Sequence, residues 1–471
     1  MPGKITEGGV ETVPEKKKHV HFVGIGGIGM SGIAEVLLTL GFTVSGSDIE
    51  RSAITDRLSS LGASVWKGHD AAHITGSDVV VVSSAIDQSN PEVTAARRLG
   101  IPVMPRTKML AELMRVRTGI AIAGAHGKTT TTSLAAAVLD EAGYDPTIVV
   151  GGRVKSIKTN ARLGEGAYIV VEADESDGNF VHLTPVYALI TNVDAEHLDF
   201  YGGLENIYDS FVRFARQVPF HGAVICCSDE PHLQTIIPRI DRRIVKYGFG
   251  PEAEVRGMEV AVRRGGSSFV LEVRGERRGE LYLNIPGTHN VSNALGVCAL
   301  AEELGIPFDA VGRAFAAFEG VARRFEIKGE RDGVLFVDDY GHHPTEIRAV
   351  IRAAREAFER RLVVVFQPHR YTRTRDVHEL FEDCFKEADE VFITDIYAAG
   401  ERPIPGITGE LVYRAARRGG HCTVSYLADR DALRRAVRGG IRPGDLVLTL
   451  GAGDIWKLGE ELLEGKGQDG T

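Results

Sequence analysis

A glycine turn between a buried-type strand and a helix constrains this chain more than any other feature. The stretch IAIAGAHGKTTTTSL, residues 120–134, runs from an apolar segment through Gly-Lys-Thr into four threonines that open a predicted helix. Backbone N–H groups at the start of a helix cradle phosphate oxygens. The stretch therefore predicts an α/β domain that binds a nucleoside triphosphate at the carboxyl end of a strand.

This loop is shorter than the full GxxxxGK[ST] pattern. Ile122 stands where that pattern has its first glycine, and Gly124 is the available glycine. The strand before it and the helix after it still favour a phosphate loop over a chance Gly-Lys-Thr. Lys128 would reach the β/γ-phosphates, and the Thr129 hydroxyl would bind Mg²⁺. The predicted ATP-binding residues of the loop are Gly124, Ala125, His126, Gly127, Lys128, Thr129 and Thr130.

A second glycine loop lies near the start of the chain. Gly24, Gly26, Gly27 and Gly29 form GIGGIG between a predicted strand and a predicted helix, and Asp48 follows nineteen residues after Gly29. Such glycines let the backbone approach a pyrophosphate, and the acid binds a ribose hydroxyl. NAD, FAD and a nucleotide sugar all carry that diphosphate, so all three stay open here. Glycines that serve only a tight turn are the simpler alternative.

The order of predicted elements divides the chain into blocks. A length of 471 residues is enough for two to four domains. Repeated strand–turn–helix units imply parallel sheets, because each crossover helix packs back on its sheet. We predict a disordered tail at 1–18 and three α/β domains at 19–106, 107–322 and 323–471, with a β-rich passage near 250–285.

Composition excludes several classes of function. A net charge of −9 argues against nucleic acid as a partner. No apolar run reaches the ~20 residues that cross a bilayer, so we expect no membrane insertion. The five cysteines show no metal-binding spacing, and the start of the chain lacks the apolar core of a signal peptide. These features favour a cytoplasmic protein.

Polar side chains, most of them acidic, follow two predicted strands of the central block. They are Glu172, Asp174 and Glu175 in YIVVEADESD, and Asn192, Asp194, His197 and Asp199 in ALITNVDAEHLD. Ligands of parallel sheets bind at the carboxyl ends of the strands, and clustered carboxylates suit Mg²⁺. Solvated surface loops are the alternative, but the neighbouring phosphate loop favours a metal site.

The third block concentrates His, Arg and Asp after two strands, in DDYGHHPTE (338–346) and QPHRYTRT (367–374). Arg370 and Arg373 could hold a carboxylate in a bidentate way, although a surface salt-bridge cluster is an equal alternative on spacing alone. His342 and His343 lack nearby partners at metal-ligand spacing. An ATP domain beside diphosphate and carboxylate sites suggests that ATP activates a carboxyl group for amide formation.

Taken in order, the motifs resemble those of the Mur ligases of peptidoglycan synthesis over nearly the whole chain. They are GIGGIGMSGIAEVL, AGAHGKTTTT, EADESDGNF, TNVDAEHLD, GTHNVSNA, ARRFE, DDYGHHPTE, QPHRYTRT and GAGDI. The resemblance implies a Rossmann-like domain for a UDP-sugar, a central mononucleotide-binding ATPase domain and a C-terminal Rossmann-like domain for an amino acid. It also implies ATP and Mg²⁺ as cofactors and UDP-N-acetylmuramate and L-alanine as substrates. We expect a monomer or dimer.

The resemblance assigns roles by position. For the UDP-sugar these are the first glycine loop with Asp48, His69, Ser84, Arg106 and Asn192. For ATP they add His289, Asn290, Asn293, Arg324 and Asp339 to the phosphate loop. Thr129, Glu172 and His197 would hold the metal, and Lys128, Glu172, His197 and His342 would be catalytic. Tyr340, His342, Arg370 and Arg373 would shape the amino-acid site, with His342 as the candidate base.

One departure and two rival functions complete the prediction. Several Mur ligases carry a carbamylated lysine about fifteen residues after the metal-binding histidine, whereas no lysine lies between His197 and Lys246 here. Asp174 and Glu175 are our candidates for a second Mg²⁺. The rival functions are a recycling ligase that attaches a ready-made tripeptide to the same UDP-sugar and a P-loop ATPase or binding protein without ligase chemistry.

Overall fold

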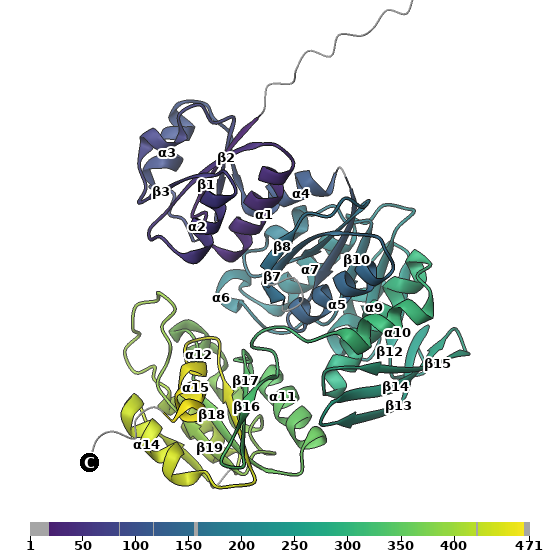
Figure 1. The fold of residues 1–471 in the computed structure, drawn as a ribbon, viewed down its shortest axis with the longest axis vertical. Helices are drawn as coiled ribbons and strands as arrows, with labels where there is room; N and C mark the ends of the chain where they lie inside the picture. The colour runs from purple at the N-terminus through teal and green to yellow at the C-terminus, as the bar shows by residue number, and fades with distance from the viewer. Residues whose placement is uncertain (1–17, 84, 116, 155–158, 421–422, 466–471) are drawn as a thin grey trace, which may run out of the picture. The chain divides into compact units, whose positions relative to one another are not determined.

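Three sheets organise the chain, and each is built around parallel strands (Figure 1). The computed structural model describes residues 18–83, 85–115, 117–154, 159–420 and 423–465. Residues 1–17 of the predicted tail and the predicted ligand Ser84 lie outside the described residues. By its internal contacts the chain divides into two compact units, residues 1–110 and 111–471. The predicted α/β class with three domains is confirmed.

The first unit contains a five-stranded parallel sheet in the order β3-β2-β1-β4-β5. Its strands are β1 His19–Val23, β2 Thr43–Asp48, β3 Ser64–Lys67, β4 Val79–Val82 and β5 Val103–Pro105. Its helices are α1 Ile28–Thr39, α2 Ala53–Ser60, the 3-10 helix η1 Ala71–Ile74 and α3 Pro91–Arg98, and α4 Arg106–Met114 leads into the next domain. The predicted UDP-sugar residues 24–29, 48, 69 and 106 follow or end strands of this sheet at one edge.

The central domain carries a ten-stranded sheet in the order β15-β14-β13-β12-β11-β10-β6-β9-β7-β8. Its strands are β6 Thr118–Ala123, β7 Thr147–Val154, β8 Thr159–Arg162, β9 Tyr168–Glu172, β10 Tyr187–Ile190, β11 Ala223–Cys227, β12 Ile244–Gly248, β13 Val255–Arg263, β14 Gly266–Val273 and β15 Glu276–Leu283. Strands β13 to β15 form the predicted β-rich passage, which extends the parallel part as an antiparallel meander.

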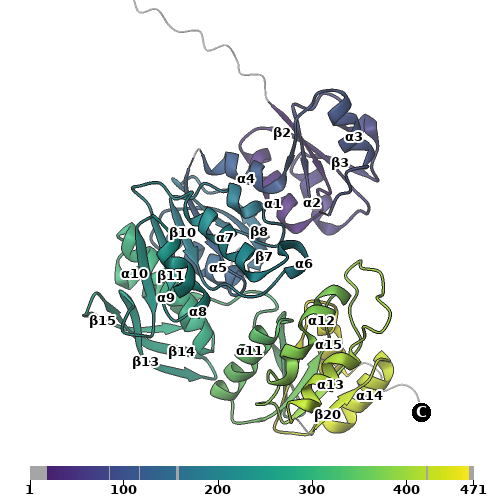
Figure 2. The same cartoon turned by 180° about the vertical axis from the view of Figure 1, so that it is seen from behind.

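Helices of the central domain cover its sheet on both faces. They are α5 Lys128–Glu141, α6 Leu198–Tyr201, α7 Leu204–Ala215, α8 Pro231–Ile236, α9 Thr288–Leu304, α10 Phe308–Ala317 and the 3-10 helices η2 Asn179–His182 and η3 Ile237–Arg239. Helix α8 comes into view beside β11 when the molecule is seen from behind (Figure 2). The central strands are apolar throughout because both of their faces are buried.

The C-terminal domain has a six-stranded sheet in the order β16-β17-β21-β18-β19-β20, in which only β16 is antiparallel to its neighbour. The strands are β16 Glu326–Arg331, β17 Val334–Asp339, β18 Arg361–Phe366, β19 Glu390–Ile393, β20 Val424–Tyr426 and β21 Asp445–Leu450. The helices are α11 Pro344–Ala357, α12 Tyr371–Val377, η4 His378–Glu382, α13 Glu410–Arg418, α14 Arg430–Gly440 and α15 Trp456–Glu464.

Strand β17 shows how this third sheet is filled. Leu335 and Val337 pack into the core that α11 and α13 cover, whereas Val334 and Phe336 pack into the core under α14 and α15. Alternate side chains of a strand point to opposite faces, so an unbroken apolar strand requires helices on both sides. Among the described residues, no helix is both long and apolar enough to span a bilayer.

Candidate active site

The predicted phosphate loop joins β6 to α5 as the sequence indicates. Gly124 has φ 137° and Gly127 has φ 80°, values that favour glycine. A Cβ at Gly124 would collide with the Thr191 side chain, and one at Gly127 would lie 2.6 Å from Asn293 Oδ1. Helix α5 begins at Lys128, so the unpaired N–H groups of its first turn face the end of the sheet. The loop therefore has the backbone geometry of an anion cradle.

Lys128 is held at the mouth of this loop. Its Nζ donates to the carbonyl oxygens of Gly124 and Ala125, at 2.6 and 3.1 Å, and to Glu175 Oε1 at 3.0 Å. Burial alone would lower the pKa of Lys128, but the charges of Glu175 and Asp174 keep it above its ordinary value. Burial raises the pKa of Glu175 to about 7, against the lowering effect of Lys128. The lysine is thus a fixed positive charge beside the predicted phosphate loop.

The predicted metal ligands fall into two adjoining groups. Thr129 Oγ1 donates to Glu172 Oε1 at 3.1 Å. His197, with φ 54°, instead gathers with Glu175 and Glu196, and one ligand atom from each of these three lies within 4.8 Å of the others. Burial lowers the pKa of His197, which favours the neutral imidazole that binds metals. The structure thereby adds Glu196 to the predicted set.

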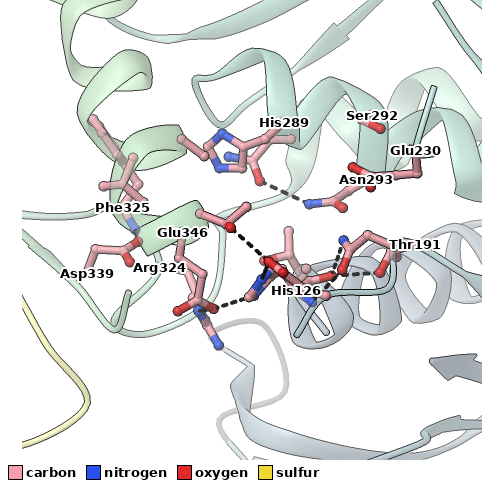
Figure 3. Close-up of a pocket in the computed structure, with 18 of the residues that line it drawn as sticks. His126, Thr191, Glu230, His289, Ser292, Asn293, Arg324, Phe325, Asp339 and Glu346 are labelled. Carbon is pink, nitrogen blue, oxygen red and sulfur yellow. Dashed lines mark hydrogen bonds and ion pairs between the residues drawn. The ribbon is translucent and has the colours of Figure 1, made fainter. Parts of the chain in front are cut away.

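A cavity of about 420 Å³ extends from the phosphate loop between α9 and the start of the C-terminal domain (Figure 3). Of the predicted ATP-binding residues it is lined by His126, Gly127, Thr130, His289, Asn290, Asn293, Arg324 and Asp339. Burial, aided by the Arg324 charge, lowers the pKa of His289 to about 4, so this imidazole is neutral. The cavity brings together residues that are more than 200 positions apart in the chain.

Two predicted ligands in this cavity already have protein partners. Asn192, which we assigned to the UDP-sugar, accepts a hydrogen bond from the His126 N–H at 2.8 Å and donates to the His126 carbonyl at 2.9 Å. Asp339 accepts bonds from the backbone N–H groups of Phe325 and Gly341, at 2.7 and 2.6 Å. Each side chain therefore shapes its loop, while their ligand roles stay predictions.

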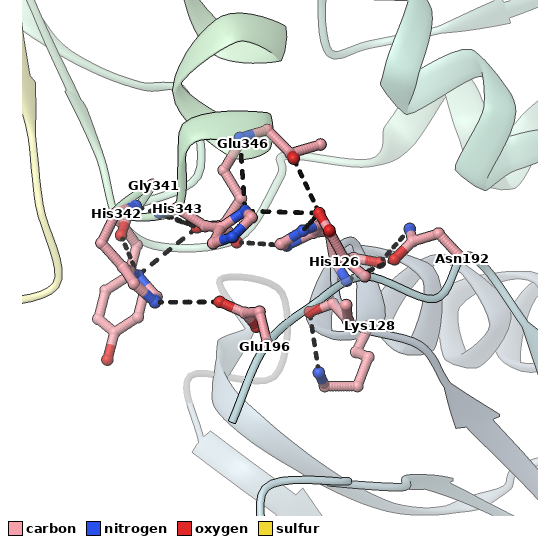
Figure 4. A network of polar contacts seen from close by, with 12 residues as sticks. His126, Lys128, Asn192, Glu196, Gly341, His342, His343 and Glu346 are labelled. Carbon is pink, nitrogen blue, oxygen red and sulfur yellow. Dashed lines mark hydrogen bonds and ion pairs between the residues drawn. The ribbon is translucent and has the colours of Figure 1, made fainter. Parts of the chain in front are cut away.

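A polar network joins the phosphate loop to the C-terminal domain (Figure 4). His126 Nε2 lies 2.9 Å from Asp194 Oδ2, and its Nδ1 lies 3.4 Å from Glu346 Oε1. Thr345 Oγ1 donates to Asp194 at 2.8 Å. Burial would lower the pKa of His126, but its hydrogen bond to Asp194 and its ion pair with Glu346 raise it to about 10. His126 therefore adds a second positive charge to the loop.

The predicted amino-acid residues cluster on the other side of this network. Arg373 Nη2 lies 3.9 Å from Glu196 Oε1, and Arg370 Nε donates to Glu401 at 2.6 Å. Tyr340 and His342 make an edge-to-face contact with ring centroids 5.7 Å apart. A small cavity of about 20 Å³ is lined by Glu196, His197, His343, Arg370 and Arg373, among others. The segment 192–197 thus lies between the larger cavity, which the predicted ATP-binding residues line, and the arginines.

The first glycine loop is fixed within its own unit. The Gly26 N–H donates to Asp48 Oδ2 at 2.8 Å, and a Cβ at Gly26 would lie 2.9 Å from that oxygen. A Cβ at Gly29 would collide with the Arg106 guanidinium. His69 Nδ1 lies 2.8 Å from Ser47 Oγ. The described predicted ligands of this domain therefore surround the carboxyl edge of one sheet.

Known protein families account for this arrangement of domains. Three family models match the chain in order: "Mur ligase family, catalytic domain" over residues 19–118, "Mur ligase middle domain" over 122–301 and "Mur ligase, glutamate ligase domain" over 323–453. The chain belongs to the Mur ligase family. Together with the phosphate loop, this membership makes it an ATP-dependent ligase.

Individual Mur ligases match over most of their length. A UDP-N-acetylmuramate–L-alanine ligase of Geobacter sp. strain M21 is 52% identical over 449 residues, which cover 95% of this chain and 97% of that protein. The crystal structure of a UDP-N-acetylmuramate–alanine ligase from Thermotoga maritima superposes with a TM-score of 0.78 at 31% identity, covering 95% and 98% of the two chains. A UDP-N-acetylmuramate:L-alanyl-γ-D-glutamyl-meso-diaminopimelate ligase from Neisseria meningitides gives 0.61 at 30% identity, covering 65% and 100%.

Sequence reasoning missed several residues of this Mur ligase site. Glu196 and Glu346 are buried among histidines, yet neither stood out from the many acidic residues of the chain. Glu401 pairs with Arg370 from a loop thirty-one positions away. For Glu196 a signal existed, because it directly precedes the predicted metal ligand His197. Glu346 lies four positions after the predicted residue His342, so local spacing already brings these two together. Its approach to His126, like that of Glu401 to Arg370, comes only from the fold.

Proposed function

We propose that this chain joins L-alanine to the lactyl carboxylate of UDP-N-acetylmuramate and converts ATP to ADP and phosphate, as a step of peptidoglycan synthesis in the cytoplasm. The observation that carries the proposal is the segment 192–197, which lines the nucleotide cavity with Asn192, Val193 and Asp194 and the arginine-lined cavity with Glu196 and His197. A carboxylate brought to this segment would meet a γ-phosphate from one side and an amine from the other.

The first step activates the carboxylate. One carboxylate oxygen of the sugar substrate attacks the γ-phosphorus of ATP. The bond between the γ-phosphorus and the β–γ bridging oxygen breaks, so that ADP departs and an acyl phosphate is formed. Lys128 and the first turn of α5 would stabilise the charge on the transferring phosphoryl group. Because Lys128 is already held by two carbonyls and Glu175, little reorganisation is needed when charge develops.

The site also fits Mg²⁺. Glu175 Oε2 and Glu196 Oε1 are buried without a hydrogen bond, although Glu175 Oε2 lies 2.8 Å from Lys128 Nζ. Each of these glutamates has one oxygen within 4.8 Å of a ring nitrogen of His197, and Glu196 Oε2 lies 4.0 Å from His197 Nε2. Oxygen ligands of this kind suit a hard cation. Glu175, Glu196 and His197 would hold one ion, and Thr129 with Glu172 would hold a second. Bound Mg²⁺ supplies charge neutralisation on the phosphate oxygens.

The second step forms the amide. The alanine amine attacks the acyl carbon, inorganic phosphate leaves, and the amine loses a proton. His342 Nδ1 donates to the Tyr340 carbonyl at 3.1 Å, so its Nε2 carries the lone pair. Burial and the charge of Arg373 lower the pKa of His342 to about 4, which keeps it unprotonated at neutral pH. His342 Nε2, 3.9 Å from Glu196, is therefore the proposed proton acceptor.

Phosphate release tests this proposal. ATP, Mg²⁺ and the full chain are incubated with UDP-N-acetylmuramate and L-alanine, separately and together, and the product is weighed by mass spectrometry. We expect release only with both substrates and a product heavier by one alanyl residue. A tripeptide replaces alanine in a parallel reaction. Phosphate release with UDP-N-acetylmuramate and the tripeptide, but not with UDP-N-acetylmuramate and alanine, would identify the recycling ligase. Phosphate release that does not depend on any amine would identify an ATPase without ligase chemistry.

A further inference from the structure

A fully buried glutamate lies among three histidines in the first unit, outside the catalytic centre. Glu92 is the second residue of α3, and its side chain has no exposure to solvent. His73 Nδ1 lies 2.8 Å from Glu92 Oε1, and Oε2 lies 3.3 Å from His69 Nδ1 and 3.7 Å from His21 Nε2. Burying a carboxylate costs free energy unless it is paired, so this placement requires a reason.

The bonds around Glu92 fix the proton on His69. The Ser47 hydroxyl donates its single proton to Glu92 Oε2 at 2.5 Å. Burial would raise the pKa of Glu92, but the nearby imidazole of His21 and the hydrogen bonds from Ser47 and His73 lower it to about 2, so both oxygens are acceptors. Ser47 Oγ must then accept its 2.8 Å bond from His69 Nδ1–H. In neutral His69 the lone pair is therefore on Nε2.

The same serine also fixes the first glycine loop. The Ser47 carbonyl accepts hydrogen bonds from the N–H groups of Gly24 and Ile25, at 2.8 and 3.0 Å. The neighbouring Asp48 accepts from the Gly26 N–H through its side chain and from the Gly68 N–H through its carbonyl, at 2.8 and 2.7 Å. The end of β2 thus binds both the glycine loop and the loop that contains His69, and Glu92 accepts a hydrogen bond from the Ser47 side chain.

We propose that Glu92 is a positioning residue of the UDP-sugar site, which acts through Ser47 to present His69 Nε2 as a hydrogen-bond acceptor. This inference rests on the proposed function only for the identity of the ligand. An acceptor cannot bind the diphosphate oxygens, so His69 meets an N–H or O–H donor of the ligand, either the uracil imide or a hydroxyl of a sugar ring. The diphosphate then belongs to the glycine loop and Arg106.

Steady-state kinetics with UDP-N-acetylmuramate test the role of Glu92. We expect Glu92→Gln and Ser47→Ala each to raise the KM for UDP-N-acetylmuramate by about 10-fold, the usual effect of losing a hydrogen bond to a charged group. The kcat and the KM values for ATP and alanine should stay within about twofold, because the catalytic groups are in another unit. The matched control is Glu35→Gln. This variant removes a carboxylate of the same domain, and that carboxylate is paired with Arg57.

Long-range ¹H–¹⁵N NMR of histidine-labelled wild-type protein tests the tautomer without any variant. We expect the His69 ring to carry a proton on Nδ1 and none on Nε2. An Nε2–H tautomer or an imidazolium would overturn the inference, as would a Glu92→Gln variant with wild-type KM. If the wild-type protein itself fails to bind UDP-N-acetylmuramate in calorimetry, the proposed function fails, whereas the tautomer of His69 is still decided by the spectrum.

Discussion

Glu92 and Glu196 are both buried and both surrounded by histidines, yet their carboxylate oxygens differ in the hydrogen bonds that they accept. Both oxygens of Glu92 accept hydrogen bonds, from Ser47 and His73 among others. Glu196 Oε1 accepts none, and the Arg373 guanidinium and the His342 imidazole each lie 3.9 Å from it. Buried polar atoms in native proteins are rarely left unpaired. This difference supports the two proposed roles, in which Glu92 positions its neighbours and Glu196 binds Mg²⁺.

Lys128→Ala should produce the largest effect. This effect should be confined to the catalytic centre that contains Glu196 and should spare the unit that contains Glu92. The variant removes the charge that we propose stabilises the transferring phosphoryl group, so we expect kcat to fall about 10³-fold. Binding of UDP-N-acetylmuramate should be unchanged, because the Glu92 framework is in another unit. Phosphate release measures the first effect and calorimetry the second.

The matched control for this lysine is Lys386→Ala, since Lys386 makes only an exposed pair with Asp383. Its kcat should equal that of the wild-type protein. A Lys128→Ala variant that kept most of its turnover would show that the phosphate loop has been assigned wrongly. Loss of UDP-sugar binding in the same variant would show that the two sites are not independent.

Glu196→Gln should have a smaller effect, visible in the requirement for metal. The amide keeps the volume of the side chain but removes one of the charges that would hold Mg²⁺. Changes around a metal typically cost 10- to 100-fold in affinity, so we expect the Mg²⁺ concentration for half-maximal phosphate release to rise by that factor. Glu92→Gln should leave this concentration unchanged. An equal response of both variants would remove the distinction drawn between the two carboxylates.

Local sequence was sufficient for the elements that lead to the site. The apolar strands β6, β9, β10, β17 and β18 and the start of α5 were predicted, because a buried strand ending at a glycine or a carboxylate leaves a clear pattern. Two strands of the third domain, β16 and β20, were missed. The sequence EIKGER has no apolar run, and VSY is three residues long. Both lie at the edges of the sheet, where one side of the ladder is unpaired and apolar side chains are not required.

Local sequence was less sufficient for the contacts between predicted residues. The phosphate loop, the cluster near His197 and the arginines were all expected. Two contacts were not expected. Asn192 is held by the phosphate loop, and Glu346 approaches His126 across 220 positions. Charge pairing of this kind depends on which strands become neighbours, and that information is not contained in the spacing of one motif.

The smallest effect we predict concerns the pH dependence of stability. It arises from His126 in the catalytic centre and not from the histidines around Glu92. The folded-state pKa of His126 is about 10, above the ~6.5 of an unfolded chain. The stabilisation that its ion pairs provide is therefore complete below about pH 6.5 and is lost as the pH rises towards 10. Asp194→Asn removes one of these pairs, so the variant should melt a few degrees lower than wild type at pH 7.

This gap in melting temperature should narrow as the pH approaches 10, because the wild-type protein loses the same interaction by deprotonation. Calorimetric melts of wild type and Asp194→Asn at pH 6, 7, 8.5 and 10 measure it, with Asp241→Asn as the control for an exposed pair. A gap that is constant with pH would show that Asp194 acts by hydrogen bonding alone and that His126 is neutral. His126 would then add no charge to the phosphate loop, and Lys128 would be its sole cationic side chain.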